Sequence, residues 1–200
     1  MIRLVNDVMR RSLLPRCVLA LCMTAGLFLA LPEAGAQSPS TALTPAATES
    51  AVKAAYLFRF VTYVVWPAGA STRLDEPVLI AVAGDDEVFA ALEPLLAGRS
   101  VDGRTLRAVR VTGQTLPEGV HMLFLGAKRD LRRDPLAATP GPVLLVTEHP
   151  DALSLGGIIN FFNDGARVRF SISLAAAEAR GLKLSARLLD VAQAVHGAPR

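Results

Sequence analysis

Cysteine is scarce in this 200-residue sequence, and both copies, Cys17 and Cys22, lie in an apolar stretch near the amino terminus. Beyond that stretch the chain cannot form a disulfide, so packing must stabilise it. Histidine is nearly as scarce: His121, His149 and His196 stand far apart, and no pair has the spacing of a zinc site. The sequence therefore predicts neither a disulfide framework nor a metal centre.

Motifs of catalysis and nucleotide binding are missing as well. Ser154 and Ser185 stand outside any Gly-x-Ser-x-Gly sequence. Gly84 and Gly126 each follow an expected strand, but neither belongs to a G-x-G-x-x-G or P-loop motif. The acidic pair at residues 85–86 fits a helix cap better than a magnesium site, because carboxylates accept the free N–H groups of a first turn. We expect no catalytic residue and no cofactor, and predict that the protein is not an enzyme.

The amino terminus has the pattern of a secretory signal. Four arginines in residues 1–16 precede the apolar run Cys17–Leu31, and Ala34-Gly35-Ala36 offers small residues for cleavage. The alternative is an uncleaved anchor, but fifteen apolar residues are fewer than the roughly 20 that span a bilayer. We predict a signal peptide at residues 1–36, export to the periplasm, and no membrane span after cleavage.

The remaining 164 residues suffice for one domain with a core. They carry 17 basic and 16 acidic side chains, so the basic pI of the whole chain gives little support for a nucleic-acid partner. Residues 37–47, rich in Ser, Thr, Pro and Ala, indicate a flexible lead. The predicted domain is 48–196, followed by a tail at 197–200.

The domain alternates helices with strands. A helix is expected from residues 48–50 to Trp66-Pro67. Its apolar stripe consists of Val52, Tyr56, Phe60 and Val64, widened by Ala55, Leu57, Phe58 and Val61. Further along, short apolar runs predict strands, and two intervening segments predict helices. The strands are 78–83, 106–111, 121–125 and 143–147, and the helices 85–96 and 128–137. This order indicates an α/β fold with a mixed, largely parallel sheet flanked by helices.

An antiparallel hairpin is expected near the carboxyl terminus. The first strand is Ile158–Phe162, and the residue types of Asn163-Asp164-Gly165 tolerate the positive φ of a tight turn. The second strand, Ala166–Ser173, alternates apolar and polar residues, which is typical of a strand with one packed face. Two helical segments follow it.

Two separated segments resemble the YfiR/HmsC family. The first is KAAYLFRFVTYVVWP at Lys53–Pro67, and the second runs from Asn160-Phe161 through GARVRF to the leucines before Val191. The resemblance implies a non-catalytic periplasmic regulator that binds the sensor module of a membrane diguanylate cyclase. By this analogy it represses cyclic-di-GMP synthesis, and with it biofilm and exopolysaccharide formation. We expect a homodimer. Ser173 stands where the family strand is expected to end in Asn.

The segment after this hairpin is the candidate for protein recognition. Its leucines should be mostly core, yet one short helix after Gly181 cannot bury all of them on one side, which favours a partner surface. Large aromatics also contribute strongly to interfaces, although Trp66 could equally belong to the core. The candidate partner-binding residues are Trp66, Glu178, Leu182, Leu184 and Arg187.

Three polar residues of the hairpin could instead bind a ligand. Arg167 and Arg169 share one strand face about 7 Å apart, a spacing that suits a carboxylate or phosphate. The alternative is that their charge protects an edge strand from further pairing. Asn160 could contact a ligand, but a hydrogen bond that fixes the backbone is favoured.

A periplasmic small-ligand-binding protein is the competing function. In open α/β sheets, ligands bind at the carboxyl ends of the strands. The corresponding cleft would lie near Gly84, Gly126 and Thr147.

Overall fold

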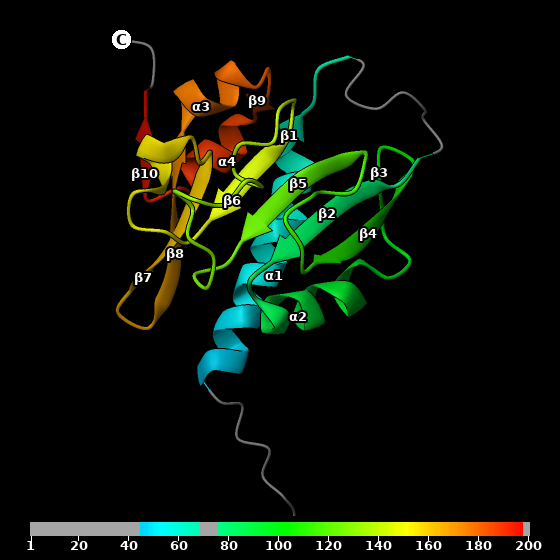
Figure 1. The fold of residues 1–200 in the computed structure, drawn as a ribbon, viewed down its shortest axis with the longest axis horizontal. Coiled ribbons are helices and arrows are strands. Elements are labelled where there is room, and N and C mark those ends of the chain that lie inside the picture. The colour runs from blue at the N-terminus through cyan, green and yellow to red at the C-terminus, as the bar shows by residue number, and fades with distance from the viewer. Residues whose placement is uncertain (1–44, 69–75, 198–200) are drawn as a thin grey trace, which may run out of the picture. The chain divides into compact units, whose positions relative to one another are not determined.

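An eight-stranded mixed sheet forms the centre of the domain (Figure 1). The computed structural model describes residues 45–68 and 76–197, all within one compact unit that spans Thr41–Arg200. The predicted signal peptide, residues 37–44 of the lead and the last three residues lie outside this description. No helix in the described ranges has the length and apolar character needed to cross a bilayer.

The strand order in the sheet is β10-β8-β7-β6-β5-β2-β4-β3. Five of the seven pairings are parallel, and the β7–β8 hairpin and the short β3–β4 pair are antiparallel. The strands are β2 Val78–Ala83, β3 Ser100–Val101, β4 Arg104–Val111, β5 Val120–Leu125, β6 Leu144–Thr147, β7 Ile159–Asp164, β8 Arg167–Ser173 and β10 Ala194–His196. This topology confirms the predicted single-domain α/β class.

Two long helices cover one face of the sheet. These are α1 (Pro45–Tyr63) and α2 (Asp86–Leu96), which lie side by side in Figure 1. Asp85 is the N-cap of α2, because its Oδ1 accepts hydrogen bonds from the backbone N–H groups of Glu87 and Val88 at 3.1 and 3.0 Å. The cap interpretation of this acidic pair is therefore confirmed.

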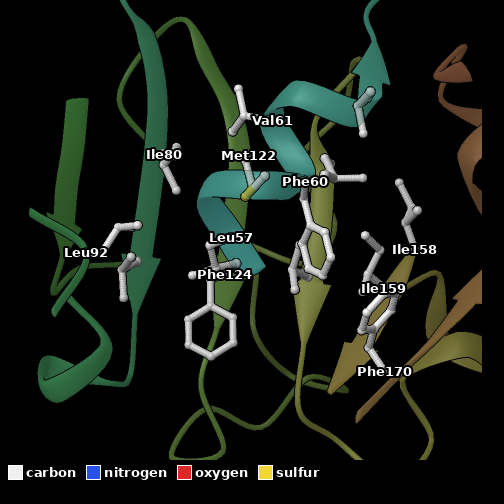
Figure 2. Packing of buried hydrophobic residues seen from close by; sticks show 14 of the residues in the cluster. Leu57, Phe60, Val61, Ile80, Leu92, Met122, Phe124, Ile158, Ile159 and Phe170 are labelled. Carbon is white, nitrogen blue, oxygen red and sulfur yellow. The ribbon is translucent and has the colours of Figure 1, made fainter. Parts of the chain in front are cut away.

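The main hydrophobic core lies between these helices and the sheet. Leu57, Phe60 and Val61 point from α1 toward the strands (Figure 2), where Met122 and Phe124 of β5 meet them. The helix buries Ala54, Leu57, Phe60 and Val61, and Val64 directly after it is also buried, whereas Val52 is 37% exposed. The predicted apolar stripe is thus confirmed at Leu57, Phe60 and Val61, whereas Val52 lies on its margin.

The opposite face of the sheet is covered by irregular chain. Its smaller core joins strand residues to Leu131, Leu136 and Ala152, which come from loops and from the 3-10 helix η1 (Ala152–Leu155). The predicted helix at 128–137 is wrong, since the segment is a series of turns. Asp134 explains the break: its carboxylate pairs with Arg129 and accepts the N–H of Leu136, and the following Pro135 disfavours a helical conformation at residue 134.

Further predicted boundaries also differ from the structure. The helix α1 begins at Pro45, before the predicted start at 48–50 and inside the predicted lead at 37–47. The hairpin turn is Gly165-Ala166, because Asp164 still pairs with Arg167 across the ladder and Gly165 has a φ of 59°. Likewise α1 ends at Tyr63 instead of Trp66. The β-branched pair Val64–Val65 forms β1, which pairs with β9 (Lys183–Leu184).

The carboxyl-terminal unit packs on the α1 side of the molecule. It contains α3 (Leu174–Ala179), β9, α4 (Ala186–Asp190) and finally β10, which extends the sheet beside β8. Ala177, Leu182 and Leu188 from this unit enter the main core. These contacts place α4 next to α1, which creates the first of two openings described below.

Candidate functional site

A groove runs between α1 and α4, and we call it the α1–α4 groove. It has a volume of about 350 Å³. Its lining residues are Val52, Ala55, Tyr56, Arg59, Phe60 and Tyr63 from α1, and Arg187, Leu188 and Val191 at α4. The lining residues of α1 recur at helical spacing. They therefore lie along one face of the helix, next to the face that is buried in the main core.

Aromatic rings form the floor of the groove. The Tyr56 ring stacks on Phe60 with centroids 5.9 Å apart and meets the edge of Phe170 at 5.3 Å. Phe60 and Phe170 are buried, whereas Tyr56 is half-buried and faces the opening. The floor is therefore continuous with the main core, which makes it rigid and apolar.

The rim of the groove combines exposed apolar residues with unpaired charge. Val52 is 37% exposed and Val191 60% exposed, and both are among the large hydrophobic residues left at the surface. Arg59 and Arg187 are exposed, and their guanidinium groups make no hydrogen bond or ion pair within the described residues. No carboxylate is among the lining residues.

A second opening lies at the carboxyl ends of β5 and β6 and along β7, and we call it the polar cleft. Its volume is about 500 Å³. The lining residues are Glu49, Lys53, Ala127, Glu148, His149, Pro150, Asn160, Phe161, Phe162 and Asn163. This is the edge of the sheet where α/β proteins commonly bind ligands.

The charged groups of the polar cleft pair with one another. The buried Lys53 ammonium donates to Glu148 and lies 2.7 Å from Glu49 one turn earlier on α1. Burial alone disfavours the charge on Lys53, but the hydrogen bonds to Glu148 and Glu49 outweigh it and raise the pKa of Lys53. The hydrogen bond from Lys53 in turn lowers the pKa of Glu49. The other oxygen of Glu148 accepts the Ala127 N–H at 2.7 Å.

Asn160 organises the other wall of the cleft. Its Oδ1 accepts from the Thr147 hydroxyl at 2.8 Å and from the His149 N–H at 3.1 Å. The side chain is buried and ties the end of β6 to β7. This geometry agrees with the favoured interpretation of Asn160 as a residue that fixes the backbone.

Arg129 lies at the topological switch point of the sheet, where consecutive strands are added on opposite sides of β2. The point lies between β2 and β5, just beyond Gly84 and Gly126. A Cβ at Gly126 would lie 2.8 Å from the Gly84 carbonyl oxygen, so the two loops are in close contact. The Arg129 side chain packs over Gly84, pairs with Asp134 and donates to the Gly113 carbonyl. Of the three residues expected near the cleft, Gly84 is covered by Arg129, and Thr147 directly precedes Glu148, which lines the polar cleft.

Trp66 is held against the sheet and does not line the α1–α4 groove. Its Nε1 donates to the His121 carbonyl at 3.3 Å, and its ring meets the His121 ring edge-on at 5.8 Å. His121 is itself buried, and its Nε2 lies 3.1 Å from Arg104 Nη2. Burial and the nearby Arg104 charge lower the pKa of His121.

The other predicted partner residues are spread over the carboxyl-terminal unit. Leu182 is only 2% exposed, so its side chain belongs to the core. Leu184 is half-buried in β9 opposite Val64, and Glu178 is exposed on α3. Arg187 alone lines the α1–α4 groove.

The two hairpin arginines occupy different environments. Arg167 is exposed opposite Asp164, whereas the Nε of Arg169 is buried without a hydrogen-bond partner in the described residues. The adjacent end of β8 is not an edge, because β10 pairs with Ser171–Ser173. Edge protection can therefore apply only to the outer half of β8. Ser173 caps α3, since its Oγ accepts from Ala176 N–H at 3.2 Å, and Asn is equally suited to that role.

Sequence reasoning missed Arg59, Tyr56 and Val191 as members of one site. The sequence places Val52 and Tyr56 on the apolar stripe of α1, and it identifies Val191 only as one of several apolar positions in the last segment. One signal was present: Arg59 interrupts the apolar run at residues 54–61 and has no acidic residue three or four positions away. The position of α4 against α1, which depends on tertiary packing, carries the remaining information.

Comparison with known proteins agrees with this domain. A family model described as YfiR/HmsC-like matches residues 50–193, which run from α1 to the residue before β10. No curated protein matches the chain. Across the described ranges, no group of three or more His, Cys, Asp or Glu side chains is arranged to hold a metal ion.

Proposed function

The chain belongs to the YfiR/HmsC-like family, whose members are periplasmic regulators of diguanylate cyclases, and we propose that it binds and represses one inner-membrane cyclase. The proposed contact is with the periplasmic sensor module of that cyclase. Repression would lower cyclic-di-GMP and, with it, biofilm and exopolysaccharide output. The protein would act without catalysis, as a binding partner that carries its own signal peptide.

The family match carries this proposal. It covers nearly all of the described domain, and its two signature segments come together in the fold. Lys53 of α1 reaches Glu148 after β6, and Glu148 adjoins the Thr147 and His149 groups that Asn160 holds. The two segments that carry the resemblance thus meet in the folded domain and stabilise it.

Repression requires a difference in affinity between two states of the cyclase. A ligand shifts an equilibrium only by its differential binding free energy, so the domain must bind the inactive arrangement of the sensor more tightly. An envelope signal that weakens the complex would then release the cyclase. A homodimer would suit a dimeric sensor, and sedimentation of the purified protein tests that part of the proposal.

Deletion of the gene provides the functional test. Loss of the protein should raise cyclic-di-GMP, and re-expression of the full chain should lower it again. The tagged chain should co-purify with a membrane protein that carries a diguanylate cyclase domain. Unchanged nucleotide levels together with no cyclase in the purified material would contradict the proposal.

The polar cleft favours one second candidate, a periplasmic protein that binds a small solute. Its volume of about 500 Å³ at the strand carboxyl ends is the observation in favour. Ion pairing of Lys53 with Glu148 and Glu49 leaves these three charges already engaged. A thermal-shift screen of periplasmic solutes distinguishes the candidates, because a free-standing solute binder gains stability from its ligand alone.

A further inference from the structure

The α1–α4 groove has the chemistry of a protein-docking surface that is selective for negative charge. Its floor is aromatic and its walls are aliphatic. Among the described residues, the charged groups that line it are the guanidinium groups of Arg59 and Arg187, one from each wall. An occupant that is apolar on one side and acidic along its flanks would match both features.

The part of the chain that the structure describes does not neutralise these two charges. On α1 the residues three and four positions from Arg59 carry no carboxylate. On α4 the single acidic residue, Asp190, makes no ion pair with Arg187 in the structure. By contrast, Arg110, Arg129 and Arg132 each pair with an aspartate. The groove arginines are therefore left available for carboxylates of another molecule.

The exposed rim favours a macromolecular occupant over a small molecule. A small aromatic acid could fill the floor beside Tyr56, but it would leave Val52 and Val191 in water. Val52 lies on the α1 wall of the groove and Val191 on the α4 wall, so an exposed valine lines each side of the opening. An element that lies along the groove covers the floor and both rims at once, so it gains more apolar burial.

The length of the groove suits a short helix. Its α1 wall extends from Val52 to Tyr63, eleven residues along a helix, which corresponds to roughly 16 Å or about three turns. The α1 residues of the wall repeat every three to four positions. The anchor residues of an amphipathic helix that docks in a groove have the same spacing.

We propose that the α1–α4 groove docks a short amphipathic helix of the protein partner, with acidic residues on its flanks that pair with Arg59 and Arg187. This inference rests on the proposed function, because the partner is the sensor module of the cyclase. It adds the place of the contact and the chemistry of the partner segment.

Charge reversal tests the inference in the full chain. The variant carries Arg59→Glu and Arg187→Glu and is expressed in the deletion strain, where cyclic-di-GMP and co-purified cyclase are measured. We expect cyclic-di-GMP to stay at the deletion level and co-purified cyclase to fall at least tenfold. The charge-preserving variant Arg59→Lys with Arg187→Lys should restore most of both. The unfolding midpoint confirms that each variant is folded.

A matched control changes the same net charge elsewhere. Arg107 and Arg133 are exposed and do not line the groove, so Arg107→Glu with Arg133→Glu should repress as the wild type does. If the groove variant also represses normally while deletion raises cyclic-di-GMP, the docking site is refuted and the regulatory function stands. If deletion itself has no effect, the proposed function and the docking site both fall. Equal loss in the groove variant and the control would show a nonspecific charge effect and also refute the site.

Discussion

The α1–α4 groove and the polar cleft share α1 as a wall, but they differ in whether their charged side chains are paired within the described residues. In the polar cleft, Lys53 is surrounded by Glu49 and Glu148, and the backbone supplies further hydrogen bonds. In the groove, Arg59 and Arg187 have no partner from the described chain and border exposed valines. We infer that the cleft stabilises the domain, whereas the groove is completed by another protein.

The largest expected effect comes from breaking the ion-pair cluster of the cleft. Lys53→Met leaves the largely buried Glu148 without its cation, and we expect a loss of about 2–4 kcal/mol in the free energy of unfolding. Urea unfolding measures the change. The double variant Lys53→Met with Glu148→Gln should recover part of the loss, since the isolated charge is gone. A single variant as stable as the wild type would contradict a stabilising role for the cleft.

A smaller loss is expected when the opposite wall of the cleft is altered. Asn160→Ala removes the acceptor of the Thr147 hydroxyl and the His149 N–H, which should cost about 1–3 kcal/mol. Gln114→Ala at an exposed loop position serves as the control and should change stability much less. Equal effects of the two substitutions in urea unfolding would show that the Asn160 hydrogen bonds add nothing.

The ion-pair cluster of the polar cleft should also contribute to the pH dependence of the free energy of unfolding. Because the pKa of Lys53 is raised on folding, its stabilising contribution is present below the unfolded pKa of about 10.4 and is lost as pH rises through the folded pKa. The wild type should therefore lose more stability than Lys53→Met on the alkaline side. Parallel alkaline curves in urea unfolding would contradict this, and Arg187→Glu should follow the wild type throughout.

The smallest effect on stability is expected in the groove. Arg59→Glu with Arg187→Glu removes no hydrogen bond or ion pair of the described chain, so each substitution should change the free energy of unfolding by less than about 0.5 kcal/mol. Thermal unfolding monitored by circular dichroism provides the measurement. A loss comparable to that of Lys53→Met would assign the groove a structural role and erase the contrast between the two regions.

Local sequence patterns predicted those parts of the fold that local chemistry determines. The buried strands, the Asp85 cap and the β7–β8 hairpin follow from apolar runs, a side-chain acceptor and turn-forming residues. The predicted helix at 128–137 failed for a different reason. Its charged residues fit helical pairing, but Pro135 and the contacts of Asp134 with Arg129 and Leu136 favour turns, and the last of these contacts exists only in the folded loop.

The candidate site was harder to predict because it depends on packing between distant segments. Arg187 was identified from the polar face of its own helix, whereas Leu182 lies in the core because the segment folds back onto α1. Arg59 and Val191 become neighbours of one groove only after α4 has packed against α1. Sequence periodicity describes the faces of each helix but does not state which face remains uncovered.

Site-specific crosslinking in cells tests the contrast between the two regions most directly. Val52 in the groove and Phe162 in the polar cleft are each 37% exposed, so they form a matched pair. Benzoylphenylalanine is placed at one or the other in the full chain, and the products are identified by mass spectrometry. We predict that position 52 crosslinks to an acidic periplasmic segment of the membrane cyclase and that position 162 does not. A cyclase crosslink from position 162 alone, or none from position 52, would contradict the account.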